Sequence, residues 1–111
     1  MYAPGALWTA AHHRIPLLLV MHNNRAYHME VMHMQRMANR RQRGVELAAH
    51  GLPGATISDP DIDFAQLARS MGAYAEGPIA NPAELRPALL RAVARVEQGE
   101  VALLDTRTQP R

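Results

Sequence analysis

Apolar and polar residues follow one another along this chain in blocks whose spacing predicts alternating helices and strands. Residues 4–13 place leucine, tryptophan and alanine side chains at helical spacing after Pro4, which suits the first turn of a short helix. The next block, residues 15–22 (IPLLLVMH), is an almost continuous apolar run with a proline near its start. Such a run is typical of a strand buried on both faces of a parallel sheet. The chain therefore begins, by prediction, with a helix and a buried strand.

The sequence pattern in the middle of the chain predicts one helix and one long loop. Residues 27–38 are rich in methionine and can form a helix, whereas residues 43–63 (RGVELAAHGLPGATISDPDID) contain glycines and prolines that break regular structure. We expect residues 43–63 to be mainly a loop. Loops of that length usually have a functional or interfacial role.

A second helix and strand follow the loop. Asp63 can cap a helix over residues 64–73, which Gly72 closes, and a short strand is expected around residues 74–76. The residues expected to form the buried face of this helix are Phe64, Leu67, Ala68 and Met71.

The sequence pattern of residues 81–108 predicts one more helix and a final strand. Asn81 can cap a helix over residues 81–99, with Pro82 in its first turn, and residues 101–108 (VALLDTRT) are typical of a buried strand. The buried stripe of this helix is expected to contain Leu85, Leu89, Val93 and Val96. Strands that alternate with helices imply an α/β fold with a parallel sheet and right-handed crossovers.

The composition fits one small folded domain. Hydrophobic residues make up 48% of the 111 residues and aromatic residues only 5%, so the core must be mainly aliphatic. There is no cysteine, which excludes a disulfide framework and a thiolate metal site. The longest apolar run is too short to cross a bilayer and no signal peptide is recognisable, so we expect a soluble, cytoplasmic protein with no membrane partner.

The charge of the chain changes this picture little. The net charge is +2, and all twelve basic residues are arginine. Four of them, Arg36, Arg40, Arg41 and Arg43, cluster in RMANRRQRG and could neutralise phosphates of a nucleic acid or another anion. Neither stacking aromatics nor a nucleic-acid motif accompanies them, so we favour a solvated or subunit-facing segment and expect no nucleic-acid partner.

Two adjacent asparagines, Asn23 and Asn24, stand at the end of the predicted strand 15–22. In open parallel sheets, ligands bind at the carboxyl ends of the strands. An asparagine side-chain oxygen and a nearby main-chain carbonyl are hard oxygen ligands suited to Mg²⁺ that also holds phosphate oxygens. An ordinary turn is the alternative interpretation of the same dipeptide.

A wider pattern favours the site over the turn. The stretch GALWTAAHHRIPLLLVMHNNRAY (residues 5–27) resembles the C-terminal half of the thiamine diphosphate motif in the acetolactate synthase, benzoylformate decarboxylase and pyruvate oxidase superfamily. The aspartate-rich turn and helix in residues 59–93 and the strand in residues 99–110 (GEVALLDTRTQP) resemble later segments of the same family. The resemblance covers essentially all of residues 1–111. It implies an incomplete α/β/α sandwich of the thiamine diphosphate-binding fold.

The resemblance also implies site residues and cofactors. It makes Asn24 a side-chain ligand of Mg²⁺ and Ala26 a ligand through its main-chain carbonyl, while Asn23 positions the loop. The remaining residues expected at the diphosphate end of thiamine diphosphate, largely through backbone amides at the start of the next helix, are Arg25, Tyr27 and His28. An exposed Arg25 without phosphate contact stays an alternative.

In the family, the chemistry belongs to the cofactor, which attacks a 2-keto acid and releases carbon dioxide before protonation or capture by a second carbonyl. His28 and His33 are candidates for proton transfer, although a structural role is the alternative for each. His12, His13, His22 and His50 have weaker claims. Glu30 and His33 can share a helix face but make a poor zinc site by themselves. No catalytic residue is assigned.

Two departures from the family pattern limit these expectations. The Gly-Asp-Gly half of the motif, which supplies another Mg²⁺ ligand, is absent and would fall just upstream of Met1 by the family spacing. The middle domain and the pyrimidine-binding domain with its glutamate are absent too. We therefore expect a C-terminal fragment that is inactive alone and has an uncovered sheet edge, and that acts, when complete, as a homo-oligomer.

Three hypotheses follow. The first is the cofactor-binding part of a thiamine diphosphate-dependent lyase or carboligase acting on a 2-keto acid. The second is a non-catalytic subunit-interaction module that retains the fold. The third, a nucleic-acid binder, rests only on the arginine cluster.

Overall fold

The computed structural model describes residues 3–46 and 54–109 of the chain. The chain divides into two compact units, one made of residues Met1–Asn23 and Asp63–Thr108 and the other of residues Asn24–Ile62 with the last three residues. The division falls between the two asparagines.

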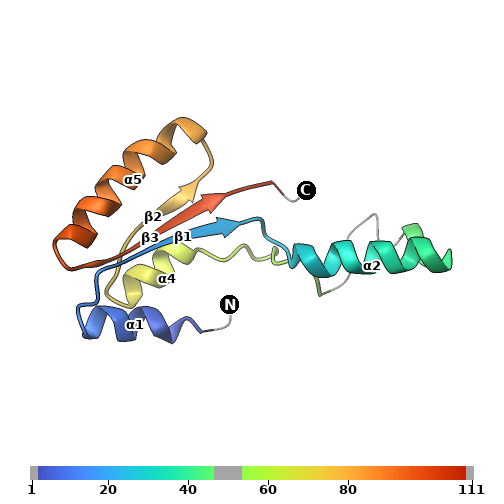
Figure 1. Cartoon of the computed structure of the whole chain (residues 1–111), viewed down its shortest axis with the longest axis horizontal. Helices are drawn as coiled ribbons and strands as arrows, with labels where there is room; N and C mark the ends of the chain where they lie inside the picture. Colours follow the sequence, from blue (N-terminus) through green and yellow to red (C-terminus); the bar gives the residue numbers. More distant parts are fainter. Residues whose placement is uncertain (1–2, 47–53, 110–111) are drawn as a thin grey trace. The chain divides into compact units, whose positions relative to one another are not determined.

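The first unit is built on a parallel sheet of three strands, β1 (Leu17–Asn23), β2 (Tyr74–Ile79) and β3 (Val101–Arg107), in the order β1-β3-β2 (Figure 1). Both neighbours of β3 run parallel to it. The predicted parallel α/β architecture is therefore confirmed, and β3, the last strand in the chain, is the central one.

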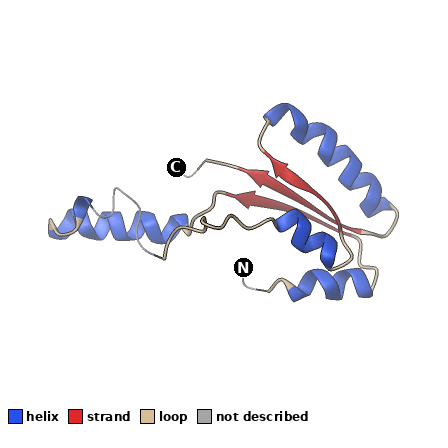
Figure 2. Ribbon diagram, turned by 180° about the vertical axis from the view of Figure 1, so that it is seen from behind, coloured by secondary structure: helices blue, strands red, loops and turns tan. Residues whose placement is uncertain are grey.

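Helices cover both faces of this sheet. The short helices α1 (Gly5–His12) and α4 (Phe64–Ser70) lie on one face, and α5 (Pro82–Glu97) lies on the other, which makes three layers (Figure 2). Alternation along β3 divides the core: Val101 and Leu103 pack with α1 and α4, whereas Ala102 and Leu104 pack with α5. The arrangement is an α/β/α sandwich, as the sequence predicted.

Both predicted helix caps are confirmed. Asp63 Oδ1 accepts a hydrogen bond from the Gln66 amide at 2.7 Å, and Asn81 Oδ1 accepts one from the Ala83 amide at 3.0 Å. Each side chain satisfies an amide that has no partner within its helix, which fixes the residue where the helix begins.

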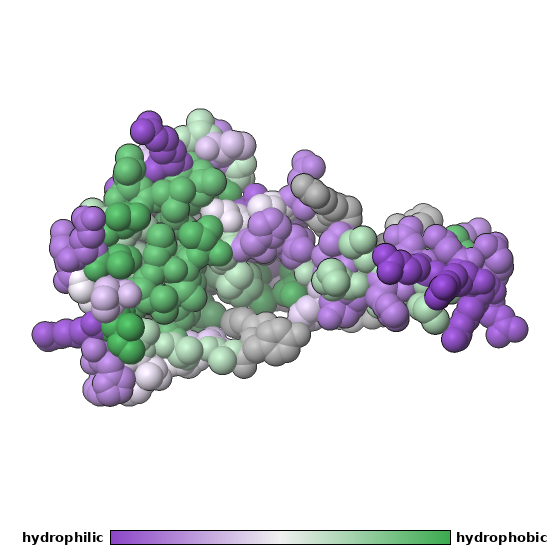
Figure 3. Space-filling view, viewed as in Figure 1, coloured by the Kyte–Doolittle hydropathy of each residue, from purple (hydrophilic) through white to green (hydrophobic). Residues whose placement is uncertain are grey.

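The prediction that the first strand is buried on both faces is wrong. Strand β1 begins at Leu17, two residues later than predicted, and borders only β3 among the described strands. Leu17 and Val20 are 40% and 50% exposed, whereas Val101–Asp105 of β3 are buried throughout. Both strands have apolar runs in the sequence, and only the order of the strands decides which run is covered. Figure 3 shows the broad hydrophobic surface of this unit on the face in view.

The predicted buried stripe of α5 is only partly correct. Leu89 and Val96 pack against the core, but Val93 is 41% exposed, and the fully buried positions are Ala88 and Ala92. The buried face of α5 is therefore centred on alanines, because a small side chain lets the helix approach the sheet closely.

The second unit contains α2 (His28–Arg41), which extends three residues beyond its predicted end and has no buried residue. The predicted long loop is tested only in part, because residues 47–53 lie outside the described residues. Residues 45–46 are helical, which the loop prediction missed, and residues 54–62 contain no helix and only a single bridge, between Ala26 and Thr56. No helix in the described part of the chain is long and apolar enough to cross a membrane.

Gly77 allows β2 to pass close to β3. Its φ is +138°, and a Cβ placed on it would lie 2.6 Å from the Cβ of Asp105 and 2.7 Å from the Asp105 carbonyl oxygen. No larger residue fits there unless one of the two strands moves.

We therefore expect Gly77→Ala to lower the free energy of unfolding by about 3 kcal/mol, since it adds a steric overlap to the cost of a positive φ. Gly99→Ala is the matched control: Gly99 also has a positive φ, +86°, but a Cβ added to it would have no atom within 4 Å. The control should cost about 1 kcal/mol in urea denaturation. Equal losses in the two variants would contradict the proposed close approach.

Candidate functional site

The carboxyl ends of β1 and β3 are joined by two buried polar side chains. Asn23, the last residue of β1, donates a hydrogen bond from Nδ2 to Oδ1 of Asp105 in β3 at 3.0 Å. Asn23 is 8% exposed and Asp105 is 1% exposed. The first of the two asparagines thus has a partner within the fold, which explains how its side-chain amide can be buried at the end of β1.

Three further bonds join the end of β1 to Thr106 of β3 and to Thr108, the residue that follows β3. The Asn23 carbonyl accepts from the Thr108 amide at 3.0 Å, and the Met21 carbonyl accepts from Thr106 Oγ1 at 2.6 Å. His22 Nδ1 lies 3.3 Å from Thr108 Oγ1. The last three residues of β1 are therefore all held by residues at the end of the central strand.

Burial raises the pKa of the Asp105 carboxyl above its ordinary value. The hydrogen bond from Asn23 opposes this rise in pKa, the charge of Asp63 adds to it, and the charge of Arg107 opposes it. Sequence reasoning did not single out Asp105. The sequence feature that could have identified it is an aspartate directly after four apolar residues in VALLDTR. A carboxyl in such a buried strand needs a buried hydrogen-bond partner.

The second asparagine belongs to the loop of the other unit. Asn24 Oδ1 accepts a hydrogen bond from the Ala26 amide at 3.1 Å. Ala26 is bridged to Thr56 in an antiparallel pair in which the bonds run from the Tyr27 amide to the Ala55 carbonyl and from the Ile57 amide to the Arg25 carbonyl. In such a pair, the amide and carbonyl of the middle residue point away from the partner segment.

Two oxygen atoms consequently share one side of this loop. The Ala26 amide points to Asn24 Oδ1, and the Ala26 carbonyl is directed away from residues 55–57 as well. An amide oxygen has two lone pairs, so Asn24 Oδ1 can accept the Ala26 amide and still bind a cation. The loop thus offers two uncharged oxygens, which is a donor set suited to a hard cation such as Mg²⁺. No group of three histidine or acidic residues that could hold a metal occurs among residues 3–46 and 54–109.

Arg25 has two unusual properties. Its φ is +57°, a left-handed conformation that is uncommon for residues other than glycine. Its buried Nε has no hydrogen-bond partner in the described part of the chain. A buried guanidinium nitrogen with no partner is costly, and an anion would satisfy it.

Tyr27 and His28 lie where α2 begins. Tyr27 is the residue before the helix and makes no side-chain cap, so the first amides of α2 have no cap from it. His28 is the first helical residue and is half-buried, whereas His33 is exposed. Amides at the start of a helix are donors for an anion, especially beside an arginine.

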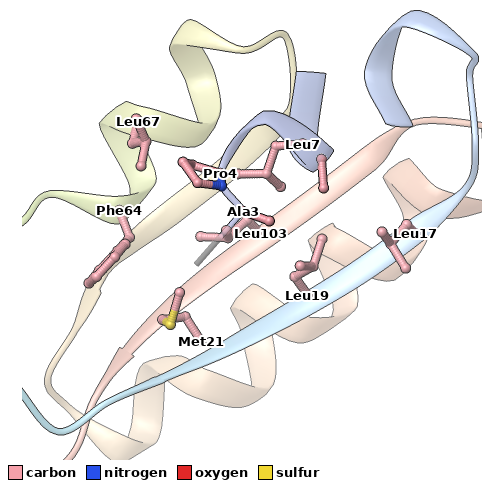
Figure 4. A pocket seen from close by; sticks show the side chains of 10 residues that line it. Ala3, Pro4, Leu7, Leu17, Leu19, Met21, Phe64, Leu67 and Leu103 are labelled. Carbon is pink, nitrogen blue, oxygen red and sulfur yellow. The ribbon is translucent and has the colours of Figure 1, made fainter. Parts of the chain in front are cut away.

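An apolar pocket of about 190 Å³ lies in the first unit, between β1 and the helices α1 and α4 (Figure 4). Leu17, Leu19 and Met21 line it from the strand, and Leu7 and Phe64 line it from the helices. It contains no side chain that donates or accepts a hydrogen bond, so it cannot hold a charged group such as a diphosphate.

The predicted site residues are therefore divided between the two units. Asn23 is the last residue of its strand and is bonded within the first unit, whereas Asn24, Arg25, Ala26, Tyr27 and His28 form one continuous loop and helix start in the second. The binding roles assigned to these residues stay predictions.

Comparison with known proteins identifies a family. The family model described as "Thiamine pyrophosphate enzyme, C-terminal TPP binding domain" matches residues 1–106. Neither the curated proteins nor the solved structures gave a significant match.

The raised pKa of Asp105 predicts how stability depends on pH. Because the folded protein favours the protonated carboxyl, ionisation of Asp105 lowers stability as the pH rises from the ordinary aspartate pKa through the raised one. Asparagine keeps an oxygen that can accept the bond from Asn23 but carries no charge. Asp105→Asn should therefore have a higher free energy of unfolding than the wild type at pH 7, and this advantage should shrink below the ordinary aspartate pKa. A difference that stays constant from pH 3 to pH 7 in urea denaturation would contradict the assignment.

Proposed function

The chain belongs to the thiamine pyrophosphate enzymes, as a C-terminal domain that binds this cofactor, also called thiamine diphosphate, and from this we propose that residues 23–28 bind its diphosphate end together with Mg²⁺. The whole enzyme is proposed to be a lyase or carboligase that acts on a 2-keto acid, as in the acetolactate synthase-like proteins that the sequence resembles. We further propose that it works as a homo-oligomer.

The observation that carries this proposal is the geometry of the loop that follows β1. Asn24 Oδ1 and the Ala26 carbonyl share the side turned away from residues 55–57, which suits two neighbouring positions of an octahedral ion. Both ligands are uncharged. The 111 residues contain no Gly-Asp-Gly motif.

Arg25 supports the same proposal. Its buried Nε has no partner among the described residues, and Arg25 lies directly between the two proposed ligands in the sequence. A diphosphate oxygen would satisfy this nitrogen, and the first amides of α2 would bind the same group. The residues present therefore fit a diphosphate bridged to a metal ion.

The cofactor, when bound, supplies the carbon chemistry of decarboxylation and ligation. In the proposal, the residues of this chain bind and orient it: Asn24 and Ala26 hold the metal, Arg25 holds the diphosphate, and Asn23 fixes the start of the loop. No proton transfer is assigned to His28 or His33.

A second candidate function is a non-catalytic interaction module that retains the fold. The exposed apolar side chains of Leu17 and Val20 on β1 and of Leu90 and Val93 on α5 favour it, since such surface usually contacts other protein. The missing anionic metal ligand is compatible with this candidate as well.

The proposal predicts that Asn24→Ala weakens Mg²⁺-dependent binding of thiamine diphosphate far more than His33→Ala does. Losing a ligand from an octahedral ion also loosens the diphosphate that the ion bridges. The loss should be about tenfold or more, because even residues that only support a metal ligand have effects of that size. Binding to the 111-residue chain should be weak, since both proposed ligands are uncharged, so NMR titration is the suitable measurement.

In that titration, Mn²⁺ replaces Mg²⁺ because both prefer six oxygen ligands. Mn²⁺ added with thiamine diphosphate should broaden the amide signals of residues 24–26 in the wild type and in His33→Ala, but not in Asn24→Ala. The chain should not decarboxylate pyruvate or benzoylformate. The proposal would be contradicted if the broadening were centred on Glu30 and His33, or if wild type and Asn24→Ala had equal affinity for the cofactor. Either result would favour the interaction module.

A further inference from the structure

Asp105 is a buried carboxyl to which the proposed function assigns no role. It lies in the central strand, it is 1% exposed, and its Oδ1 accepts a hydrogen bond from the Asn23 side chain across the carboxyl ends of β3 and β1. A hydrophobic residue of similar volume would be less costly to bury at this position. Stability of the fold is therefore a poor explanation for a carboxyl at this position. A buried donor that needs a hydrogen-bond acceptor is a better one.

The need arises from Asn23. Its side-chain amide is buried with it, and without an acceptor the donor would be left unsatisfied at a cost of about 1–3 kcal/mol. A side chain of Asn23 that turned toward water would strain the backbone of the same residue, whose carbonyl accepts the Thr108 amide at 3.0 Å. With Asp105 in place, both the side chain and the carbonyl of Asn23 are fixed.

The peptide that follows Asn23 is the start of the loop with the proposed metal ligands. The Asn23 carbonyl belongs to the peptide group that links Asn23 to Asn24, so the bond to Thr108 fixes the plane of that peptide. Asn24 is the next residue, and its side chain bonds to the Ala26 amide. Rotation of the Asn23 peptide would therefore change the backbone conformation at Asn24, whose side chain bonds to the Ala26 amide.

We infer that Asp105 is a positioning residue: through its hydrogen bond to Asn23, it holds the loop that presents Asn24 Oδ1 and the Ala26 carbonyl to the metal ion. This inference rests on the proposed function for the identity of the ligand. Its structural half, the ordering of the loop by Asp105, does not need the ligand.

Asp105→Leu is the informative variant because it keeps the number and branching of the side-chain heavy atoms and removes the acceptor. Thr106→Val is its matched control, since it removes the 2.6 Å bond from Thr106 Oγ1 to the Met21 carbonyl, which joins the same two strands but leaves Asn23 untouched. Asp105→Asn is the conservative variant that keeps an acceptor. Asp105→Ser, which is smaller and has a hydroxyl too short to reach Asn23, is used should Asp105→Leu fail to fold.

Two quantities are measured on each variant of the 111-residue chain: hydrogen exchange of the Ala26 amide without metal, and the affinity for Mn²⁺ with thiamine diphosphate by NMR. Asp105→Leu, or Asp105→Ser, should speed Ala26 exchange and weaken Mn²⁺ affinity by about tenfold or more. Asp105→Asn should retain most of the wild-type affinity. Thr106→Val should lower stability in urea but leave both quantities as in the wild type.

The outcomes separate the two claims. If Asp105→Leu or Asp105→Ser matches Thr106→Val in Ala26 exchange and in Mn²⁺ affinity, Asp105 is only structural and the inference is overturned. If Mn²⁺ does not affect residues 24–26 of the wild type, the proposed function fails, and Ala26 exchange still decides whether Asp105 orders the loop. Loss of affinity in Asp105→Asn equal to that in Asp105→Leu would also overturn the inference, because the charge and not the acceptor would then matter.

Discussion

The hydrogen bond between Asn23 and Asp105 is the constraint on which the candidate site depends. It joins two residues that are 82 positions apart, because a crossover between parallel strands places the ends of β1 and β3 side by side. The carboxyl is tolerated in the core only because Asn23 donates to it, and Gly77 must lack a side chain because Asp105 occupies the space beside it. The sheet and the start of the loop are in this way specified by the same few residues.

Local features of the fold could be predicted from the sequence. Features that depend on the order of the strands in the sheet could not. The caps at Asp63 and Asn81 were predictable because a capping side chain bonds within its own first turn. The burial of β1 was not, because its apolar run resembles that of β3, and only the topology makes β3 central. The burial of Ala88 and Ala92 rather than Val93 was not predicted either, because it depends on how closely the helix approaches the sheet.

The candidate site shows the same division. The two asparagines stood out because amides rarely end a buried strand, and the family resemblance gave Asn24 and Ala26 their expected roles. Asp105 was missed because its partner lies at the far end of the chain, and the orientation of Ala26 was out of reach because Thr56, thirty residues later, sets it. The orphaned Nε of Arg25 also becomes visible only when the surrounding side chains are placed.

The central claim is that Asn24 Oδ1 and the Ala26 carbonyl hold the metal ion that bridges to the cofactor diphosphate. The most direct measurement is a crystal structure of the chain grown with Mn²⁺ and thiamine diphosphate, in which anomalous scattering locates the ion. We predict one peak within ligand distance of both oxygens, with a diphosphate oxygen completing the bridge. A bound diphosphate whose metal ion touches neither Asn24 nor Ala26 would contradict the claim.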